Sequence, residues 1–216
     1  MKVNDIQVLI LDFDGVVIES NDVKTEAFNH VFGRFPEHAE AMMKFHHDHV
    51  SLSRFEKFKH LLTLMGRNDD TVLKEDITKD FSMRILDRMA TVPLVSGALE
   101  FLRIMTPKMP VYLASVTPEE ELSLILKQRE LTHWFRGIYG CPPWTKPDAI
   151  QDVLSKEGLL PEQALLIGDS AGDQRAAQLC GVAFLARNSG LSFDLPLPLT
   201  FQDLSEITNY FNNQIL

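Results

Sequence analysis

The chain has 216 residues and a formal net charge of −9, from 30 acidic and 21 basic residues. That length fits one large domain, or one domain with a smaller insertion. The hydrophobic share of 45% and the charged share of 24% are ordinary for a globular protein. The acidic balance argues against nucleic acid or an anionic membrane as the main partner. It leaves room for a small anion held by a local cation.

The two cysteines, Cys141 and Cys180, do not have the spacing of a metal site or a disulfide framework. Free thiols are typical of a reducing compartment. The amino-terminal residues lack the charged, apolar and small-residue regions of a secretory signal. No segment reaches the ~18 apolar residues of a membrane span. We therefore expect a cytoplasmic protein.

The first predicted strand is the apolar run from Val8 to Leu11, which leads into Asp12, Asp14 and Gly15. The run is short and rich in branched residues, which is typical of a strand buried on both faces. Carboxylates at the end of a buried strand are costly unless something compensates their charge. Ligands bind at the carboxyl ends of strands in open α/β sheets, so both aspartates are candidate functional residues. The alternative is a loop of solvated acids.

A polar block over residues 17–90 has helical spacing and no convincing strand. One helix is predicted from Glu19 to Phe32. Ser53 and Glu56 have the spacing of a capping box before another helix, and Asp69–Met89 supplies one or two more. We expect this block to be an inserted all-helical domain, close to the lower size limit for independent packing.

After residue 90, predicted strands alternate with predicted helices. The strands are expected at Val111–Ala114, Gly137–Gly140, Ala164–Ile167 and Val182–Leu185, and the helices at Ser96–Met105, after Thr117, at Pro147–Glu157, up to Cys180 and near Ser205–Phe211. Thr117 is expected to cap its helix. The proline-containing tail Leu195–Leu199 cannot be a central strand. Such alternation implies right-handed crossovers and a parallel sheet. We predict an α/β, Rossmann-like three-layer sandwich over 1–16 and 91–216, with a helical cap domain over 17–90.

Polar groups follow three more predicted strands, so the carboxyl edge of the sheet should gather them. They are Ser115, Lys146 and the segment Gly168–Asp173, which together with the first strand supply the carboxylates of Asp12, Asp14, Asp169 and Asp173. Four carboxylates at short range would repel one another. A hard divalent cation such as Mg²⁺, which takes oxygen ligands, resolves that repulsion. With the lysine, the set suits an anion of spread charge, as in phosphoryl transfer.

In chain order, these segments resemble the four motifs of the haloacid dehalogenase superfamily, in its Mg²⁺-dependent phosphatase branch. The matching segments are Asp12-Phe13-Asp14-Gly15, then Ser115, then Lys146-Pro147, then Gly168-Asp169-Ser170 with Asp173. The helical block resembles the type-1 cap of that family. The pattern is most similar to phosphoglycolate phosphatases and β-phosphoglucomutases, and the resemblance spans nearly the whole chain.

The resemblance implies a role for each core residue. Asp12 would be the nucleophile and form an aspartyl-phosphate. Asp14 would protonate the leaving oxygen and then activate water, which requires a raised pKa. Asp12, Asp169 and the backbone carbonyl of Asp14 would bind Mg²⁺, and Asp173 would support the metal or hold Lys146.

The same resemblance assigns the phosphate to Ser115, Val116, Gly15 and Lys146, with Ser115 and Lys146 also taking part in catalysis. The acid at Asp14 is missing from dehalogenases and phosphonate hydrolases, so it indicates a phosphate ester. Relatives often carry Asp in place of Glu19, Pro in place of Ala149 and a polar residue in place of Val116.

Three features of the helical block are less specific. Arg54 is a candidate for a second anionic group of the substrate, and Lys57 a weaker one; the alternative is a solvated helix face. The run His46-His47-Asp48-His49 is interpreted as surface histidines rather than a metal cluster, because neighbouring helix positions point apart.

The function expected from these residues is Mg²⁺-dependent hydrolysis of a small phosphate monoester by a monomer or weak dimer. A sugar phosphomutase of the β-phosphoglucomutase type is the main alternative, since it would use the same groups. A protein that binds a phosphate ligand without turnover is a further alternative.

Overall fold

The computed structural model describes residues 3–194 and 199–215. The chain divides into two compact units. The core unit comprises Met1–Glu19 and Pro93–Leu216, and the helical unit comprises Ser20–Val92. Residues 17–19 belong to the core unit because they pair with 93–95. The Glu19 N–H donates to the carbonyl of Pro93 (2.9 Å), and that of Val95 to Val17 (3.0 Å).

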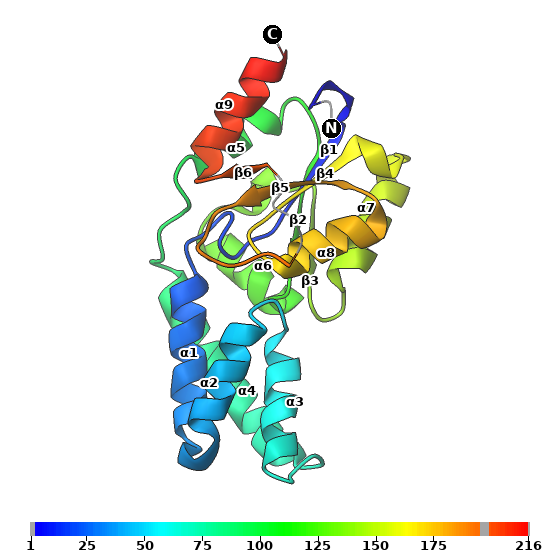
Figure 1. Ribbon diagram of the computed structural model, residues 1–216. Helices are drawn as coiled ribbons and strands as arrows, with labels where there is room; N and C mark the ends of the chain where they lie inside the picture. The colour runs from blue at the N-terminus through cyan, green and yellow to red at the C-terminus, as the bar shows by residue number, and fades with distance from the viewer. Residues whose placement is uncertain (1–2, 195–198, 216) are drawn as a thin grey trace. The chain divides into compact units, whose positions relative to one another are not determined.

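The core unit is built on a six-stranded parallel sheet in the order β3-β2-β1-β4-β5-β6 (Figure 1). The strands are β1 Val8–Leu11, β2 Val111–Ser115, β3 Gly137–Gly140, β4 Ala164–Gly168, β5 Ala183–Arg187 and β6 Thr200–Phe201. Every residue of β1, β2 and β4 is buried, as expected for a parallel sheet covered on both faces. The predicted Rossmann-like α/β class is confirmed. The edge strand β6 was not predicted, and most of the tail before it, 195–198, lies outside the described residues.

Helices cover this sheet. They are α5 Ala98–Met105, α6 Glu119–Gln128, α7 Lys146–Glu157, α8 Ala171–Cys180 and α9 Leu204–Ile215, with 3₁₀ turns at Val3–Asp5, Thr132–Trp134 and Pro161–Gln163. α7 and α8 pack on the face that carries Val8 and Ile10. α9 packs on α5, where the rings of Phe101 and Phe211 meet edge to face. None of the described helices is long and apolar enough to cross a membrane.

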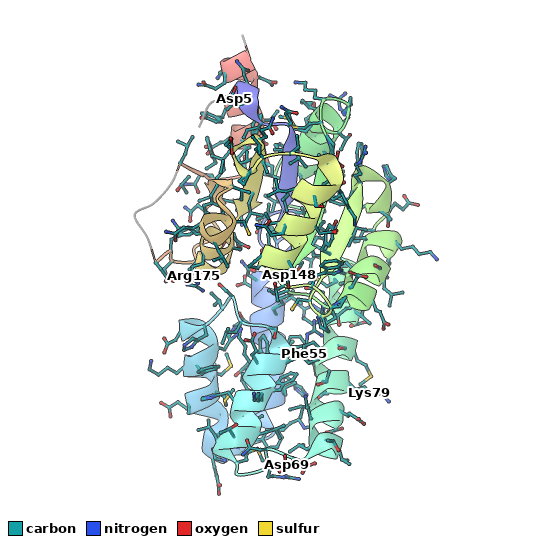
Figure 2. All side chains as sticks on the ribbon, turned by 90° about the vertical axis from the view of Figure 1, so that its right-hand side faces the viewer. Asp5, Phe55, Asp69, Lys79, Asp148 and Arg175 are labelled. Carbon is teal, nitrogen blue, oxygen red and sulfur yellow. The ribbon has the colours of Figure 1, made fainter. Side chains whose placement is uncertain are left out.

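Capping side chains set the start of the helices that follow β3 and β4. α7 begins with a capping box of Thr145 and Asp148, and Figure 2 labels the latter. α8 begins with a box of Ser170 and Asp173. The predicted helix after Thr117 is present as α6, but the predicted cap by Thr117 was wrong, because α6 starts at Glu119 without a side-chain cap. The Thr117 hydroxyl instead donates to Asp14 (3.0 Å).

The helical unit contains four helices around an aromatic core. They are α1 Asn21–Gly33, α2 Pro36–Asp48, α3 Arg54–Leu64 and α4 Thr71–Met89. The predicted capping box of Ser53 and Glu56 is confirmed at α3, and the turn after α3 carries Asp69 (Figure 2). The rings of Phe28, Phe58 and Phe81 pack with centroids 4.5–6.0 Å apart. These contacts join α1, α3 and α4.

The interpretation of the histidine run as surface residues was wrong for His46. His47 and His49 are exposed, but His46 is buried. Its Nδ1 lies 2.9 Å from Lys57 Nζ, and its Nε2 lies 3.1 Å from Thr25 Oγ1. The His46 side chain of α2 therefore lies inside the helical unit, and its two partners are Thr25 on α1 and Lys57 on α3.

Candidate active site

The parallel register brings the polar ends of β1, β2 and β4 together. Leu11 lies opposite Leu113 on β2 and Ile167 on β4. The predicted functional side chains lie at the last position of β2 and just after β1 and β4, which places them on one edge of the sheet. Asp12 is 5% exposed and Asp169 is 2% exposed, so both carboxylates are withdrawn from bulk water.

A carboxylate cluster forms at this edge. One carboxylate oxygen from each of Asp12, Asp169 and Asp173 lies within 4.8 Å of the others. Lys146 Nζ lies 3.0 Å from Asp12 Oδ1 and also pairs with Asp173 Oδ1. The backbone N–H of Phe13 donates to the same Asp12 oxygen (2.7 Å). The structure thus brings together four side chains that come from three separate segments of the chain.

Asp173 has both carboxylate oxygens engaged. Oδ1 takes Lys146, while Oδ2 accepts the N–H of Asp169 (3.2 Å), the N–H of Ser170 (3.1 Å) and the Ser170 hydroxyl (2.7 Å). Gly168 makes this close packing possible, because a Cβ there would lie 2.3 Å from the Cβ of Asp173. Of the two roles predicted for Asp173, these contacts favour holding Lys146.

The cluster carries more negative than positive charge. Burial and the neighbouring carboxylate of Asp173 raise the pKa of Asp12 well above its usual value, and Lys146 offsets part of that rise. Burial disfavours the charged Lys146, but Asp12 and Asp173 outweigh it and raise its pKa. A lysine that stays protonated leaves the three carboxylates incompletely balanced. The buried oxygen donors fit a hard divalent cation such as Mg²⁺.

Asp14, the second aspartate of the first motif, accepts hydrogen bonds from two hydroxyls. Asp14 Oδ2 accepts the hydroxyl of Ser115 (3.1 Å) and the hydroxyl of Thr117 (3.0 Å). The Thr117 N–H donates in turn to Ser115 Oγ (3.0 Å). Thr117 was missed as a site residue, although its place two residues beyond β2 was a signal for it. Val116 lies between the two and is half-buried.

The candidates in the helical block have partners in their own unit. The Arg54 guanidinium donates to Ser82 Oγ (2.9 Å) and lies 4.5 Å from the ring centroid of Phe81. Lys57 is 1% exposed and donates to the carbonyl of Val50 (3.1 Å) besides meeting His46. A substrate role for Arg54 stays a prediction, and the contacts of Lys57 favour packing.

The parallel sheet covered by helices is a Rossmann-like α/β fold. The cluster of carboxylates and Lys146 at its carboxyl edge is a site that could bind a metal ion and an anion. The profile of the haloacid dehalogenase-like hydrolase family matches residues 9–187, and the chain belongs to this family. The resemblance predicted from the motifs is confirmed.

Two phosphoglycolate phosphatases match this chain at moderate sequence identity. Phosphoglycolate phosphatase from Pseudomonas savastanoi pv. phaseolicola is 36% identical over 96 residues, which are 42% of this chain and 35% of that protein. Phosphoglycolate phosphatase 1 from Pseudomonas aeruginosa is 26% identical over 204 residues, covering 88% of this chain and 72% of the relative. The matched stretches span 35–60% of the length of the first three curated relatives.

The fold recurs among solved structures. The HAD-hydrolase YfnB from Bacillus subtilis, described as bound to magnesium, superposes with a TM-score of 0.70 at 16% identity. The match covers 96% of this chain and 99% of that one. At this identity the likeness concerns the fold alone.

Proposed function

We propose that this chain hydrolyses a small phosphate monoester with the help of Mg²⁺, through an aspartyl-phosphate on Asp12. The observation that carries the proposal is the buried cluster of Asp12, Asp169 and Asp173 with Lys146, beside the hydroxyl-bound Asp14. Relatives named phosphoglycolate phosphatases and a neighbour described as bound to magnesium support it.

The first step forms a bond between an Asp12 carboxylate oxygen and phosphorus. The bond between phosphorus and the ester oxygen breaks, and the leaving oxygen takes a proton from Asp14. Lys146 and the Mg²⁺ would favour the charged form of Asp12 against the effect of burial, so this carboxylate would need no general base in order to attack. Lys146 holds the nucleophile, since Oδ1 of Asp12 accepts from its ammonium. Ser115, Val116 and Gly15 are the proposed partners of the phosphate oxygens.

The second step returns the enzyme to its starting state. Asp14, now deprotonated, takes a proton from water, whose oxygen forms a bond to phosphorus as the bond to Asp12 breaks. One inorganic phosphate is released, and Asp14 is protonated again. The Thr117 hydroxyl donates to Asp14 Oδ2 and fixes the position of Asp14 in both steps, whereas the Ser115 hydroxyl would turn from Asp14 to a phosphate oxygen when the substrate binds.

Asp12, Asp169 and the backbone carbonyl of Asp14 would hold the Mg²⁺. Bound there, the ion would supply positive charge for the phosphate oxygens and for the carboxylate cluster. Asp173 would act beside this set by keeping Lys146 in place.

The helical unit is the proposed cap. Closure of such a domain would exclude water during the first step and admit it for the second. Arg54 is its proposed substrate contact, and a cation there suits a small phosphorylated metabolite with a second anionic group.

The test is phosphate release from a panel of phosphorylated metabolites, with and without Mg²⁺. Wild type, Asp12→Asn and Asp5→Asn are compared. Asp5 is exposed ahead of β1, so the last variant controls for loss of a charge (Figure 2). We expect Mg²⁺-dependent release that only Asp12→Asn abolishes, and an acid-trapped phosphoenzyme that hydroxylamine cleaves.

No release from any member of the panel would contradict hydrolysis. Conversion of one sugar phosphate into an isomer, lost in Asp12→Asn, would then identify a phosphomutase. Release that persists at full rate in Asp12→Asn would contradict the aspartyl mechanism.

A further inference from the structure

The guanidinium of Arg187 connects three segments of the core unit. The residue ends β5 and is 9% exposed. Its Nη1 donates to the carbonyl of Gly15 (3.1 Å) and to Glu19 Oε2 (3.0 Å), and its Nη2 donates to Glu19 Oε1 (2.5 Å). Its Nε donates to the carbonyl of Gln202 (3.0 Å). We call Arg187 with Glu19 the clamp.

The clamp holds the loop that carries Asp14. Gly15 has φ +71°, and its N–H donates to the carbonyl of Ile18 (2.8 Å). Val17 donates back to the carbonyl of Phe13 (2.9 Å). The loop is therefore a tight turn whose two ends are tied together. The Arg187 guanidinium binds this loop at two places: the carbonyl of Gly15, directly after Asp14, and the carboxylate of Glu19, at the other end of the loop.

Two features separate the clamp from an ordinary surface ion pair. An exposed pair pays side-chain entropy and gains little. Arg103 and Glu100 on α5 are such a pair, with side chains 66% and 54% exposed. The Arg187 side chain is 10% exposed, and it bonds two backbone carbonyls besides the carboxylate. A planar guanidinium with several fixed partners imposes a geometry.

We infer that Arg187 and Glu19 are positioning residues for Asp14, an inference that rests on the proposed function. Asp14 must deliver its proton to the leaving oxygen, and a small displacement of a catalytic group is costly. The clamp restricts the backbone on one side of Asp14, while Ser115 and Thr117 restrict its carboxylate. Neither member of the clamp needs to touch the substrate.

The test compares two kinds of substrate in the intact protein. An alkyl phosphate needs a proton on its leaving oxygen, whereas a nitrophenyl phosphate needs little help. In Arg187→Met and Glu19→Gln, we expect kcat/KM to fall about tenfold or more on the alkyl ester, part of the range that general acid catalysis contributes. The fall on the nitrophenyl ester should be much smaller. Asp14→Asn should show the same selectivity and mask the effect of Arg187→Met.

Arg103→Met is the matched control, because it removes an arginine from a two-contact pair in the same unit. It should leave both substrates unaffected. Equal losses on the two esters, or losses no larger than those of the control, would overturn the inference. Arg187→Lys and Glu19→Asp keep the charge and should recover only part of the rate, since neither keeps the paired geometry. They also serve if Arg187→Met does not fold.

A second readout does not depend on catalysis. Amide hydrogen exchange at Gly15, Val17 and Ile18 should accelerate in Arg187→Met and stay unchanged in Arg103→Met. If wild type hydrolyses nothing, the proposed function fails while this measurement still tests the clamp. Unchanged exchange at those amides would overturn the clamp itself.

Discussion

At the scale of single residues, the hydrogen bonds around Asp14 come from a segment about one hundred positions away in the chain. Ser115 and Thr117 are spaced by two in sequence, and the end of β2 directs both hydroxyls to the same carboxylate oxygen. Ser115 was predicted as a site residue from its place after a strand. Thr117 was assigned to a helix cap, because a hydroxyl before Pro-Glu-Glu has that local pattern.

Thr117→Val tests this hydroxyl. The change keeps the shape of the side chain but removes the donor 3.0 Å from Asp14. We expect kcat for phosphate release to fall about tenfold with little change in KM, because a positioned acid contributes to the chemical steps. Thr106→Val, at the end of α5, is the control. A change in KM alone would contradict the assignment.

Gly168→Ala tests the packing beneath Lys146. The added methyl would lie 2.3 Å from the Cβ of Asp173, which has to move. We expect a loss of about 1–3 kcal/mol in the free energy of unfolding, as for other overpacked sites, together with lower activity. Denaturant unfolding and phosphate release measure the two. Gly33→Ala has open space around the new methyl and should show no activity loss.

At the scale of elements, helices α2 and α3 are in contact through two buried basic side chains, His46 on α2 and Lys57 on α3. Burial lowers the pKa of His46 to about 3, with the positive charge of Lys57 adding to the effect. Burial also lowers the pKa of Lys57 to about 7, and Glu56 opposes this only in part. Both groups are easier to protonate in the unfolded chain than in the folded unit. Periodicity alone predicted neither side chain to be buried.

Above pH 7, the sign of the pH dependence follows from the lowered pKa of Lys57. Between pH 7 and the ordinary lysine value near 10.5, the unfolded state binds a proton at Lys57 that the folded state does not. Stability of the helical unit should therefore rise with pH across this window, by at most about 1.4 kcal/mol per pH unit. Lys57→Met should remove that slope, and Lys59→Met, an exposed site on the same helix, should keep it. Unfolding curves at several pH values measure both.

At the scale of the whole molecule, the chain consists of two units with separate cores. The carboxylate cluster lies entirely in the core unit, so ligands of the cluster should act on that unit's stability. The helical unit has its own aromatic core and its own capping box at the start of α3. We therefore expect two unfolding transitions that respond differently to added ions.

Added Mg²⁺ should raise the unfolding midpoint of the core unit and leave that of the helical unit unchanged. A ligand at one hundred times its Kd stabilises the folded state by about 2.7 kcal/mol. Asp169→Asn should remove the shift, whereas Asp5→Asn should retain it. Differential scanning calorimetry with and without Mg²⁺ measures this, and an equal shift in both variants would contradict a metal site at the cluster.

The sequence by itself determined the alternation of helices with strands β1 to β5, the parallel sheet and the edge at which Asp12, Asp169 and Lys146 meet. Those features follow from local periodicity and from the rule that parallel strands end at one edge. Only the tertiary structure decided which side chains touch there. The bonds from Thr117 to Asp14, from Arg187 to Gly15 and from Lys57 to His46 join different elements. Such contacts depend on how elements pack in three dimensions, and no short-range pattern encodes that packing.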